Sequence, residues 1–305
     1  MEKRKIFVIG HKNPDTDSVC SAIAYAQLKN EIDTENEYIP LRAGQTNEET
    51  QYVLKQFGVN APQYVMDVKS QVKDIEIRKV DGVDRNISIK AAWKLMRDIG
   101  VVTLPITRDN KLEGLITIAD IATSYMDVHD STTLSTARTV CKNIVETLDG
   151  ALIIGDEEHV FDRGKVLVAA ANPDLMESYI RMGDIVILGN RYESQLCAIE
   201  MQAGCIVVCE GAPVSMTIKK LAVENHCTII STPHDTFTAS RLINQSVPIS
   251  FFMRTEGLIT FSTEAYTDEV RQVMAKKRHR DFPIHDEQGN YIAVSYTHLR
   301  AHETR

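Results

Sequence analysis

The sequence predicts an α/β protein that opens with a doubly wound parallel sheet and then changes character. Within residues 1–65, short apolar runs alternate with helical patterns in the order strand, helix, strand, helix. The pattern of residues 66–128 returns in residues 249–293, which indicates an internal repeat. Further apolar runs between the two copies predict a separate α/β domain. The first sheet is therefore interrupted by a long insert.

The first segment supplies two strands and two helices. Buried-strand patterns fall at Lys5–Ile9 and Tyr38–Leu41, and helical patterns fall at Ser18–Lys29 and Glu48–Phe57, with Gly58 ending the second helix. Parallel strands joined by helical crossovers need this order. We expect the first helix to bury one apolar face, formed by Val19, Ile23, Ala26 and Leu28.

The repeat keeps a constant offset between its two copies. Leu95-Met96 and Leu104–Ile106 match Val273-Met274 and Phe282–Ile284, a shift of 178 positions (95 to 273, 104 to 282). Each copy predicts a helix, a strand that contains proline, an acidic turn and a second strand. The two copies are therefore expected to fold alike.

The region between the copies, residues 129–248, holds four apolar runs that predict buried strands. The runs are short and rich in β-branched residues, and helical patterns separate them, which is typical of an α/β domain. They lie at Gly150–Ile154, Lys165–Val168, Asp184–Leu188 and Cys205–Val208.

Composition excludes some classes of partner. The net charge is -8 and the pI is about 5.6, so neither a nucleic-acid backbone nor an anionic membrane is an expected partner. The apolar run Ile6–Ile9 is too short for a signal peptide, and no run reaches the roughly 18 residues of a membrane span, so we expect a cytoplasmic protein. The six dispersed cysteines are predicted to be reduced core residues: Cys20, Cys141, Cys197, Cys205, Cys209 and Cys227.

The loop Gly10–Ser18 carries the strongest chemical signal. It follows a predicted strand and precedes a helix, where open α/β sheets bind their ligands. His11, Asp15 and Asp17 offer one imidazole and two carboxylates, a set that suits Mn²⁺, Co²⁺ or Mg²⁺ better than structural zinc. The alternative is a solvated capping loop with Asp17 or Ser18 as the N-cap. A calcium loop is excluded because the glycine and glutamate it needs are missing.

This loop, continued by Val19–Ala26, closely resembles the N-terminal motif of family II inorganic pyrophosphatases in the DHH phosphoesterase superfamily. Ala43-Gly44 and Asn47–Thr50 match a second stretch of that family. Thr16 and Ser18 favour the pyrophosphatase branch over relatives with a Pro-Asp-Gly-Asp motif. The resemblance implies hydrolysis of pyrophosphate to two phosphates by a water that two metal ions activate, with Mn²⁺ or Co²⁺ as cofactor, two per site, and Mg²⁺ with the substrate.

The same resemblance implies the ligand assignment. His11 and Asp15 would bind one metal ion and Asp17 the other. The remaining catalytic residues are not identified, because the family's later Asp-His-Asn and Asp-His-His motifs and its basic C-terminal domain are absent. We therefore expect this chain to be the front portion of the enzyme and to be inactive by itself. His129-Asp130, His234-Asp235 and His285-Asp286 are interpreted as surface polar residues rather than substitutes.

Each copy of the repeat resembles a CBS domain, a module that pairs with a second copy and binds adenine nucleotides in the cleft. Gly114–Asp120 matches the family's ribose and phosphate pattern, which makes Thr117 and Asp120 the nucleotide-binding candidates. The alternative is that Thr117 is only a strand residue and Asp120 only a helix N-cap. The resemblance implies adenine nucleotides and diadenosine polyphosphates as effectors and a homodimer. The middle region, through Gly183–Arg191, resembles the DRTGG domain.

These resemblances divide the chain into five segments. The second CBS copy is incomplete, since the repeat predicts a glycine near Ala293, and the last residues resemble a translated sequencing adapter, which we exclude as a non-native tail. The segments are the N-terminal portion of a DHH domain (1–65), the first CBS domain (66–128), the DRTGG-like domain (129–248), the second CBS domain (249–293) and the tail (294–305).

Two other functions remain open. The first is another DHH phosphoesterase activity, on polyphosphate or short oligonucleotides. The second is a nucleotide-sensing module without catalysis, in which the Asp-rich loop is vestigial.

Overall fold

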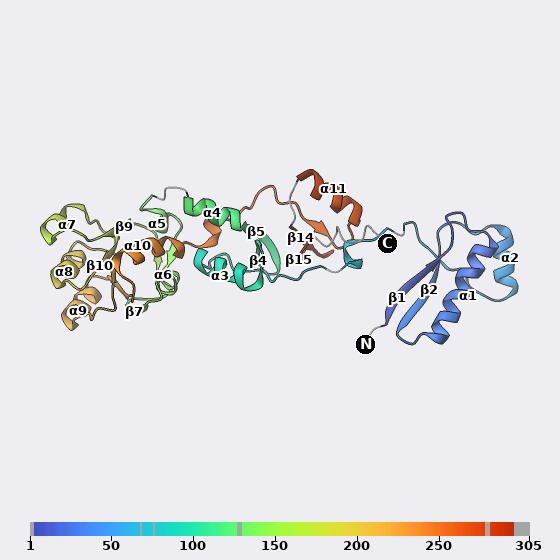
Figure 1. Cartoon of the computed structure of the whole chain (residues 1–305), viewed down its shortest axis with the longest axis horizontal. Coiled ribbons are helices and arrows are strands. Elements are labelled where there is room, and N and C mark those ends of the chain that lie inside the picture. The colour runs from blue at the N-terminus through green and yellow to red at the C-terminus, as the bar shows by residue number, and fades with distance from the viewer. Residues whose placement is uncertain (1–2, 68, 76, 127–129, 278–280, 296–305) are drawn as a thin grey trace. The chain divides into compact units, whose positions relative to one another are not determined.

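The computed structural model describes residues 3–67, 69–75, 77–126, 130–277 and 281–295 (Figure 1). The chain divides into two compact units, Met1–Gln71 and Val72–Arg305. In the described residues, no helix is both long and apolar enough to cross a membrane.

The first unit is a three-stranded sheet in the order β1-β2-β3 with both pairings parallel; the sequence predicts β1, β2 and the parallel arrangement but misses β3. Its helix α1 is fastened to β2 by Asn30, whose side chain accepts from Tyr38 N and donates to Tyr38 O, both at 2.7 Å. The elements are β1 (Arg4–Ile9), α1 (Thr16–Ile32), β2 (Asn36–Arg42), α2 (Glu48–Gln56) and β3 (Gln63–Tyr64).

The predicted apolar face of α1 is wrong at one position. Val19, Ala22 and Ala26 are buried, whereas Leu28 is 54% exposed. Successive residues of a helix turn by about 100°, so Leu28 points roughly 200° away from Ala26. The three-stranded sheet covers only a narrow stripe of small residues.

The second unit contains both copies of the repeat, and their elements correspond. Each copy has a helix followed by an antiparallel hairpin, as the sequence predicts. The first copy consists of α3 (Ile89–Ile99), β4 (Thr103–Arg108), β5 (Lys111–Thr117) and α4 (Ile118–Met126). The second consists of β13 (Phe261–Ser262), α11 (Thr267–Lys277), β14 (Phe282–His285) and β15 (Tyr291–Ser295).

The structure shows that the two copies also correspond in a segment before the helix, which the sequence pattern did not include. Val83 forms a parallel bridge to Ile106, and Phe261 pairs in parallel with Ile284, again 178 positions on. Ala293 lies opposite Ile284 as Gly114 lies opposite Ile106, which is the place where the repeat predicts a glycine. Strand β15 continues to Ser295, two residues into the segment predicted as a tail, and the rest of that segment lies outside the described residues.

Equivalent residues of the two copies touch each other. Thr103 Oγ1 donates to Asp281 Oδ2 at 2.9 Å, and these residues are 178 positions apart. Tyr291 donates from its backbone N to Asn110 O and from its hydroxyl to Val80 O, each at 2.7 Å. These three hydrogen bonds join the two copies directly.

The middle domain is a five-stranded sheet in the order β7-β12-β11-β10-β9. Its strands are β7 (Ala151–Ile154), β9 (Val166–Val168), β10 (Ile185–Leu188), β11 (Cys205–Val208) and β12 (Thr228–Ser231); only the edge strand β7 is antiparallel. The sequence predicts four of these strands and misses β12. Shorter elements complete the unit: η1 (Val72–Asp74), α5 (Thr133–Thr136), β6 (Thr139–Val140), β8 (Val160–Phe161), η2 (Ile243–Ser246) and η3 (Ile249–Phe251).

Alternate residues of the central strands enter two different cores. Val186 and Ile206 pack with helices α7 (Pro173–Tyr179), α8 (Tyr192–Glu200) and α9 (Met216–Glu224). Ile185 and Ile187 face the other way and pack with α6 (Cys141–Thr147) and α10 (Thr236–Leu242), in a cluster that also contains α3, β4 and β5 of the first copy. Because strand side chains alternate between faces, one sheet joins the helical layer to the repeat.

All six cysteines are free, and every one except the half-buried Cys20 is buried. Burial raises the pKa of Cys141 and that of Cys227 to about 12. The prediction of reduced core cysteines is confirmed for those five.

Candidate functional site

The loop between β1 and α1 places the three predicted metal ligands at the carboxyl end of a parallel strand. His11 Nε2 lies 3.4 Å from Asp15 Oδ1. Asp17 stands in the first turn of α1, where its Oδ1 accepts from Ser21 Oγ at 3.4 Å. Among the residues that the structure describes, no group of three or more His, Cys, Asp and Glu could hold a metal ion. The structure brings His11 and Asp15 together and keeps Asp17 apart.

The helix cap differs from the alternative that the sequence left open. Asp15 is the N-cap of α1, and its Oδ1 accepts from Ser18 N at 2.9 Å, so neither Asp17 nor Ser18 caps the helix. This backbone hydrogen bond, with the nearby His11, lowers the pKa of Asp15. A cap that orients a carboxylate does not exclude metal binding, because the second oxygen stays available.

The loop fits a metal site in two further respects. Ser18 Oγ is buried and has no hydrogen-bond partner in the described structure. A Cβ at Gly10 would collide with that hydroxyl, and one at Gly44 would lie 2.6 Å from Lys12 O. The two glycines therefore let the loop fold tightly, with its imidazole and carboxylates exposed. Imidazole with carboxylate is the donor set that Mn²⁺ and Co²⁺ accept.

The predicted nucleotide residues contact each other directly. Asp120 Oδ2 accepts from Thr117 N at 2.9 Å and from Thr117 Oγ1 at 2.7 Å, while Asp120 N donates to Thr117 Oγ1 at 3.2 Å. This reciprocal arrangement is a capping box at the start of α4. The alternative of Asp120 as the N-cap is wrong, since Asp120 lies in the first helical turn.

A cavity of about 440 Å³ lies between the two copies, and its lining includes Thr117 and Ala119, which precedes Asp120 in the chain. The first copy contributes Thr117 and the second contributes Lys277, and apolar walls come from both. The volume falls within the usual range for small-molecule sites. The apolar wall residues are Val102, Leu115, Ile118, Leu258, Ile259 and Phe282.

Arg254 lines this cavity and is absent from the sequence predictions. Arg254 donates to Asp120 Oδ1 from Nε at 2.8 Å and from Nη2 at 2.6 Å. It lies near the start of the second copy, before β13 and outside the matched positions of the repeat, so no sequence pattern pointed to it.

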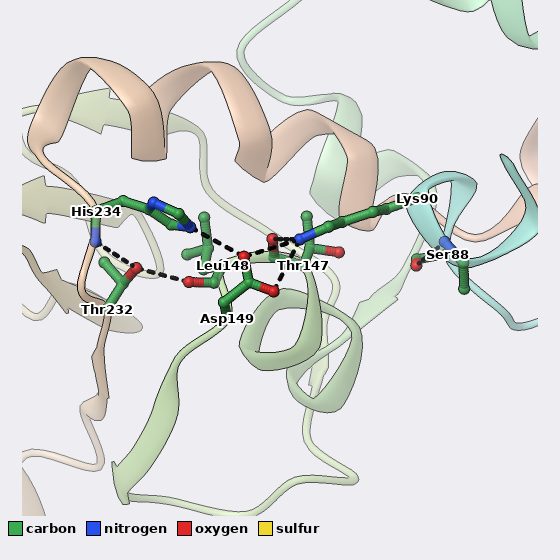
Figure 2. A network of polar contacts seen from close by, with 8 residues as sticks. Ser88, Lys90, Thr147, Leu148, Asp149, Thr232 and His234 are labelled. Carbon is green, nitrogen blue, oxygen red and sulfur yellow. Dashed lines mark hydrogen bonds and ion pairs between the residues drawn. The ribbon is translucent and has the colours of Figure 1, made fainter. Parts of the chain in front are cut away.

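A second polar network joins the first copy to the middle domain (Figure 2). Lys90, on α3, donates to Thr147 O at 2.8 Å and to both carboxylate oxygens of Asp149 at 3.0 and 3.1 Å. His234 Nε2 lies 3.0 Å from Asp149 Oδ2. Thr232 Oγ1 donates to Leu148 O at 2.7 Å and accepts from His234 N at 3.2 Å.

The outcomes for the three His-Asp pairs differ. His234 is more than a surface residue, since it is only 27% exposed and bridges two loops. Asp235 caps α10 through Thr238, and Asp286 accepts from the side chain and backbone of Asn290. The prediction for His129 lies outside the described residues.

Family models match two regions of the chain. The model of the DHH family, N-terminal domain, matches residues 5–154, and the model of the DRTGG domain matches residues 143–246.

The chain is similar to known pyrophosphatases. It is 39% identical over 300 residues to the cobalt-dependent inorganic pyrophosphatase of Clostridium perfringens, and 30% identical over 290 residues to the probable manganese-dependent inorganic pyrophosphatase of Thermotoga maritima. These matches cover 97% and 95% of the chain. They cover 54% and 53% of the relatives, so the chain spans about half their length.

A solved structure matches the inserted region. It contains the CBS and DRTGG domains of the regulatory region of Clostridium perfringens pyrophosphatase, complexed with the activator diadenosine tetraphosphate. The match has 36% identity and a TM-score of 0.71, and it covers 75% of this chain and 100% of that one. The chain therefore combines a match to the DHH N-terminal domain with a region similar to the CBS and DRTGG regulatory region of a pyrophosphatase. The family resemblance and fold class predicted from the sequence are thereby confirmed.

We predict that Asp149→Asn lowers the free energy of unfolding by about 0.5–1 kcal/mol at neutral pH, because Asp149 is more than half exposed and solvent screens its contacts. Lys90 and then His234 lower the pKa of Asp149. A lowered folded-state pKa stabilises the protein above the unfolded value near 3.8, and this stabilisation is lost as the pH falls through the folded value.

Urea unfolding of both proteins from pH 7 to pH 2.5 measures this difference. A double-mutant cycle of Lys90→Met and Asp149→Asn should show that their effects on the free energy of unfolding are coupled. Lys94→Met is the control for Lys90→Met, because Lys94 is exposed and lies one turn further along α3. If the wild type and Asp149→Asn differed as much in unfolding free energy at pH 2.5 as at pH 7, the ionised Asp149 would not be what stabilises this network.

Proposed function

We propose that this protein takes part in the hydrolysis of inorganic pyrophosphate to two phosphates, with the loop between β1 and α1 as its metal site. The single observation that carries the proposal is the placement of His11, Asp15 and Asp17 at the carboxyl end of the β1-β2 sheet. The pyrophosphatase relatives support it, since they are similar over nearly the whole chain.

His11 and Asp15 would hold one ion and Asp17 a second, with Mn²⁺ or Co²⁺ as the metal and Mg²⁺ accompanying the substrate. The 3.4 Å distance between His11 Nε2 and Asp15 Oδ1 supports a shared ion for those two residues. Such ions supply a nucleophilic water at neutral pH and neutralise phosphate charge. The chain's own contribution is orientation: Ser18 N holds Asp15, and Ser21 Oγ holds Asp17.

The paired copies would regulate this activity by binding adenine nucleotides at Thr117 and Asp120. The cavity beside these residues supports the proposal, as does the similar regulatory region, whose activator is diadenosine tetraphosphate. The proposed division is a DHH segment at 1–65, CBS domains at 66–128 and 249–293, and a DRTGG domain at 129–248. We further propose a cytoplasmic homodimer that binds no nucleic acid.

The second candidate is nucleotide sensing without catalysis. The cavity between the two copies, with its apolar walls and the cations Arg254 and Lys277, favours a chain whose own chemistry is binding. By itself the chain is expected to release no phosphate, since two bridged ions need on the order of six donors and the loop offers three.

We predict that Asp15→Asn and Asp17→Asn each weaken Mn²⁺ binding by the 305-residue chain at least about tenfold, because each replaces a charged ligand by a neutral one. In an enzyme of the relatives' full length, each should cut phosphate release from pyrophosphate at least about 10²-fold. Calorimetry and a phosphate assay measure the two effects.

Glu31→Gln is the matched control, because Glu31 is an exposed carboxylate on the same helix as Asp17. Metal binding and activity within about threefold of wild type for both aspartate variants would rule out the loop as the metal site.

We predict that Asp120→Ala weakens adenine-nucleotide binding by about 1–2 kcal/mol, the size of a lost charge-assisted hydrogen bond. Titration calorimetry with AMP measures the effect. Asp98→Ala, an exposed change on α3 of the same copy, should leave the affinity unchanged. An unchanged affinity in Asp120→Ala would mean that the capping box has only a structural role.

A further inference from the structure

The carboxylate proposed to bind nucleotide is fully engaged by the protein itself. Asp120 Oδ2 takes both donors of Thr117, and Oδ1 takes two N–H groups of Arg254. The Asp120 side chain is 12% exposed. A ribose hydroxyl that approaches Oδ1 must therefore compete with a guanidinium group.

The backbone of Arg254 is fixed while its side chain is half exposed. Arg254 N donates to Leu115 O at 2.9 Å, and Leu115 N donates to Arg254 O at 3.0 Å. A Cβ at Gly114 would come within 2.8 Å of Arg254 O, so the absence of a side chain there permits this close approach. The guanidinium of Arg254, whose side chain is 52% exposed, can turn without moving the strand bridge.

The guanidinium also contributes to the cavity wall. Among the residues that the structure describes, the cations Arg254 and Lys277 and the carboxylates Glu256 and Asp281 line it. A guanidinium presents a planar fork of N–H donors that matches phosphate as well as carboxylate. Arg254 can thus bind a phosphate in place of its carboxylate partner, and Asp120 then keeps its two hydrogen bonds from Thr117.

We infer that Arg254 binds the phosphate of the nucleotide, and that its contact with Asp120 is the ligand-free arrangement which the nucleotide replaces. On binding, the phosphate takes the guanidinium of Arg254 and a ribose hydroxyl takes the freed oxygen of Asp120. No bond is made or broken in this exchange other than hydrogen bonds and ion pairs. The inference rests on the proposed nucleotide site and adds to it the residue that recognises the phosphate.

The exchange makes opposite predictions for two ligands. Arg254→Ala should weaken the binding of AMP at least about tenfold, because the phosphate loses the paired N–H donors of the guanidinium. The affinity of the same variant for adenosine should stay within about threefold of the wild-type value or increase, because Asp120 Oδ1 is then free for the ribose. Arg254→Lys keeps the charge but loses the fork, so its affinity for AMP should be intermediate.

Titration calorimetry of the full chain with AMP and with adenosine tests the inference. Arg163→Ala is the matched control: Arg163 also stands near an aspartate, Asp162 at 3.6 Å, but does not line this cavity, and both affinities should be unchanged. Thermal unfolding of each variant shows whether it is folded before its affinities are compared.

The outcomes separate the inference from the proposed site. Equal weakening of AMP and adenosine in Arg254→Ala overturns the inference, since it shows a structural role, and so does an unchanged affinity for AMP. In both cases binding of AMP by the wild type keeps the proposed site intact. Failure of the wild-type chain to bind AMP overturns the site and the inference together.

Discussion

The second unit depends on one constraint: the chain that leaves the first copy of the repeat must return beside that copy after the middle domain. The two copies of the repeat are 178 positions apart, so the intervening domain must leave and come back at one place. Three backbone hydrogen bonds hold that junction: Ile89 N to Val247 O, Ile249 N to Ile87 O and Ser250 N to Arg85 O, all between 2.9 and 3.0 Å. The junction lets Thr103 and Asp281 meet, and with them the copies enclose the cavity.

The same junction explains why the middle domain and the first copy share a core. One face of the five-stranded sheet packs against α6 and α10, and this cluster includes Met96 of α3 and Leu104 of β4. Two such buried side chains contribute on the order of 2 kcal/mol each. The polar network of Lys90, Asp149 and His234 lies at the same boundary (Figure 2). Apolar packing and ion pairing thus act together there, and packing contributes more.

Local patterns predict most of the elements and the ligand-bearing loop. The strands at residues 5–9 and 205–208 are visible as apolar runs, and the repeat offset is visible in Leu104–Ile106 and Phe282–Ile284. Both are visible because buried positions of a regular helix or strand recur as apolar residues at a fixed spacing. The pattern misses strand β12, since its run begins at a threonine beside a cysteine and leaves a weak signal. The prediction for α1 is wrong at Leu28 because the width of the covering sheet is a tertiary property.

Side-chain partners far apart in the chain leave no such record. Arg254 reaches Asp120 across 134 positions, and His234 reaches Asp149 across 85. Each partner is an ordinary surface residue type, and only the folded backbone brings the pair together. The capping residue of α1 is a related case, since Asp15, Asp17 and Ser18 all suit the role and the loop geometry decides among them.

The central claim is that the paired copies form one nucleotide site around Thr117, Asp120 and Arg254. A crystal structure of this chain grown with AMP tests it most directly. The account predicts AMP in the 440 Å³ cavity, with its phosphate on Arg254, a ribose hydroxyl on Asp120 and the contact between those two side chains broken. AMP bound elsewhere, such as in the 830 Å³ cavity lined by Arg138 and Lys142, with Arg254 still on Asp120, would contradict it.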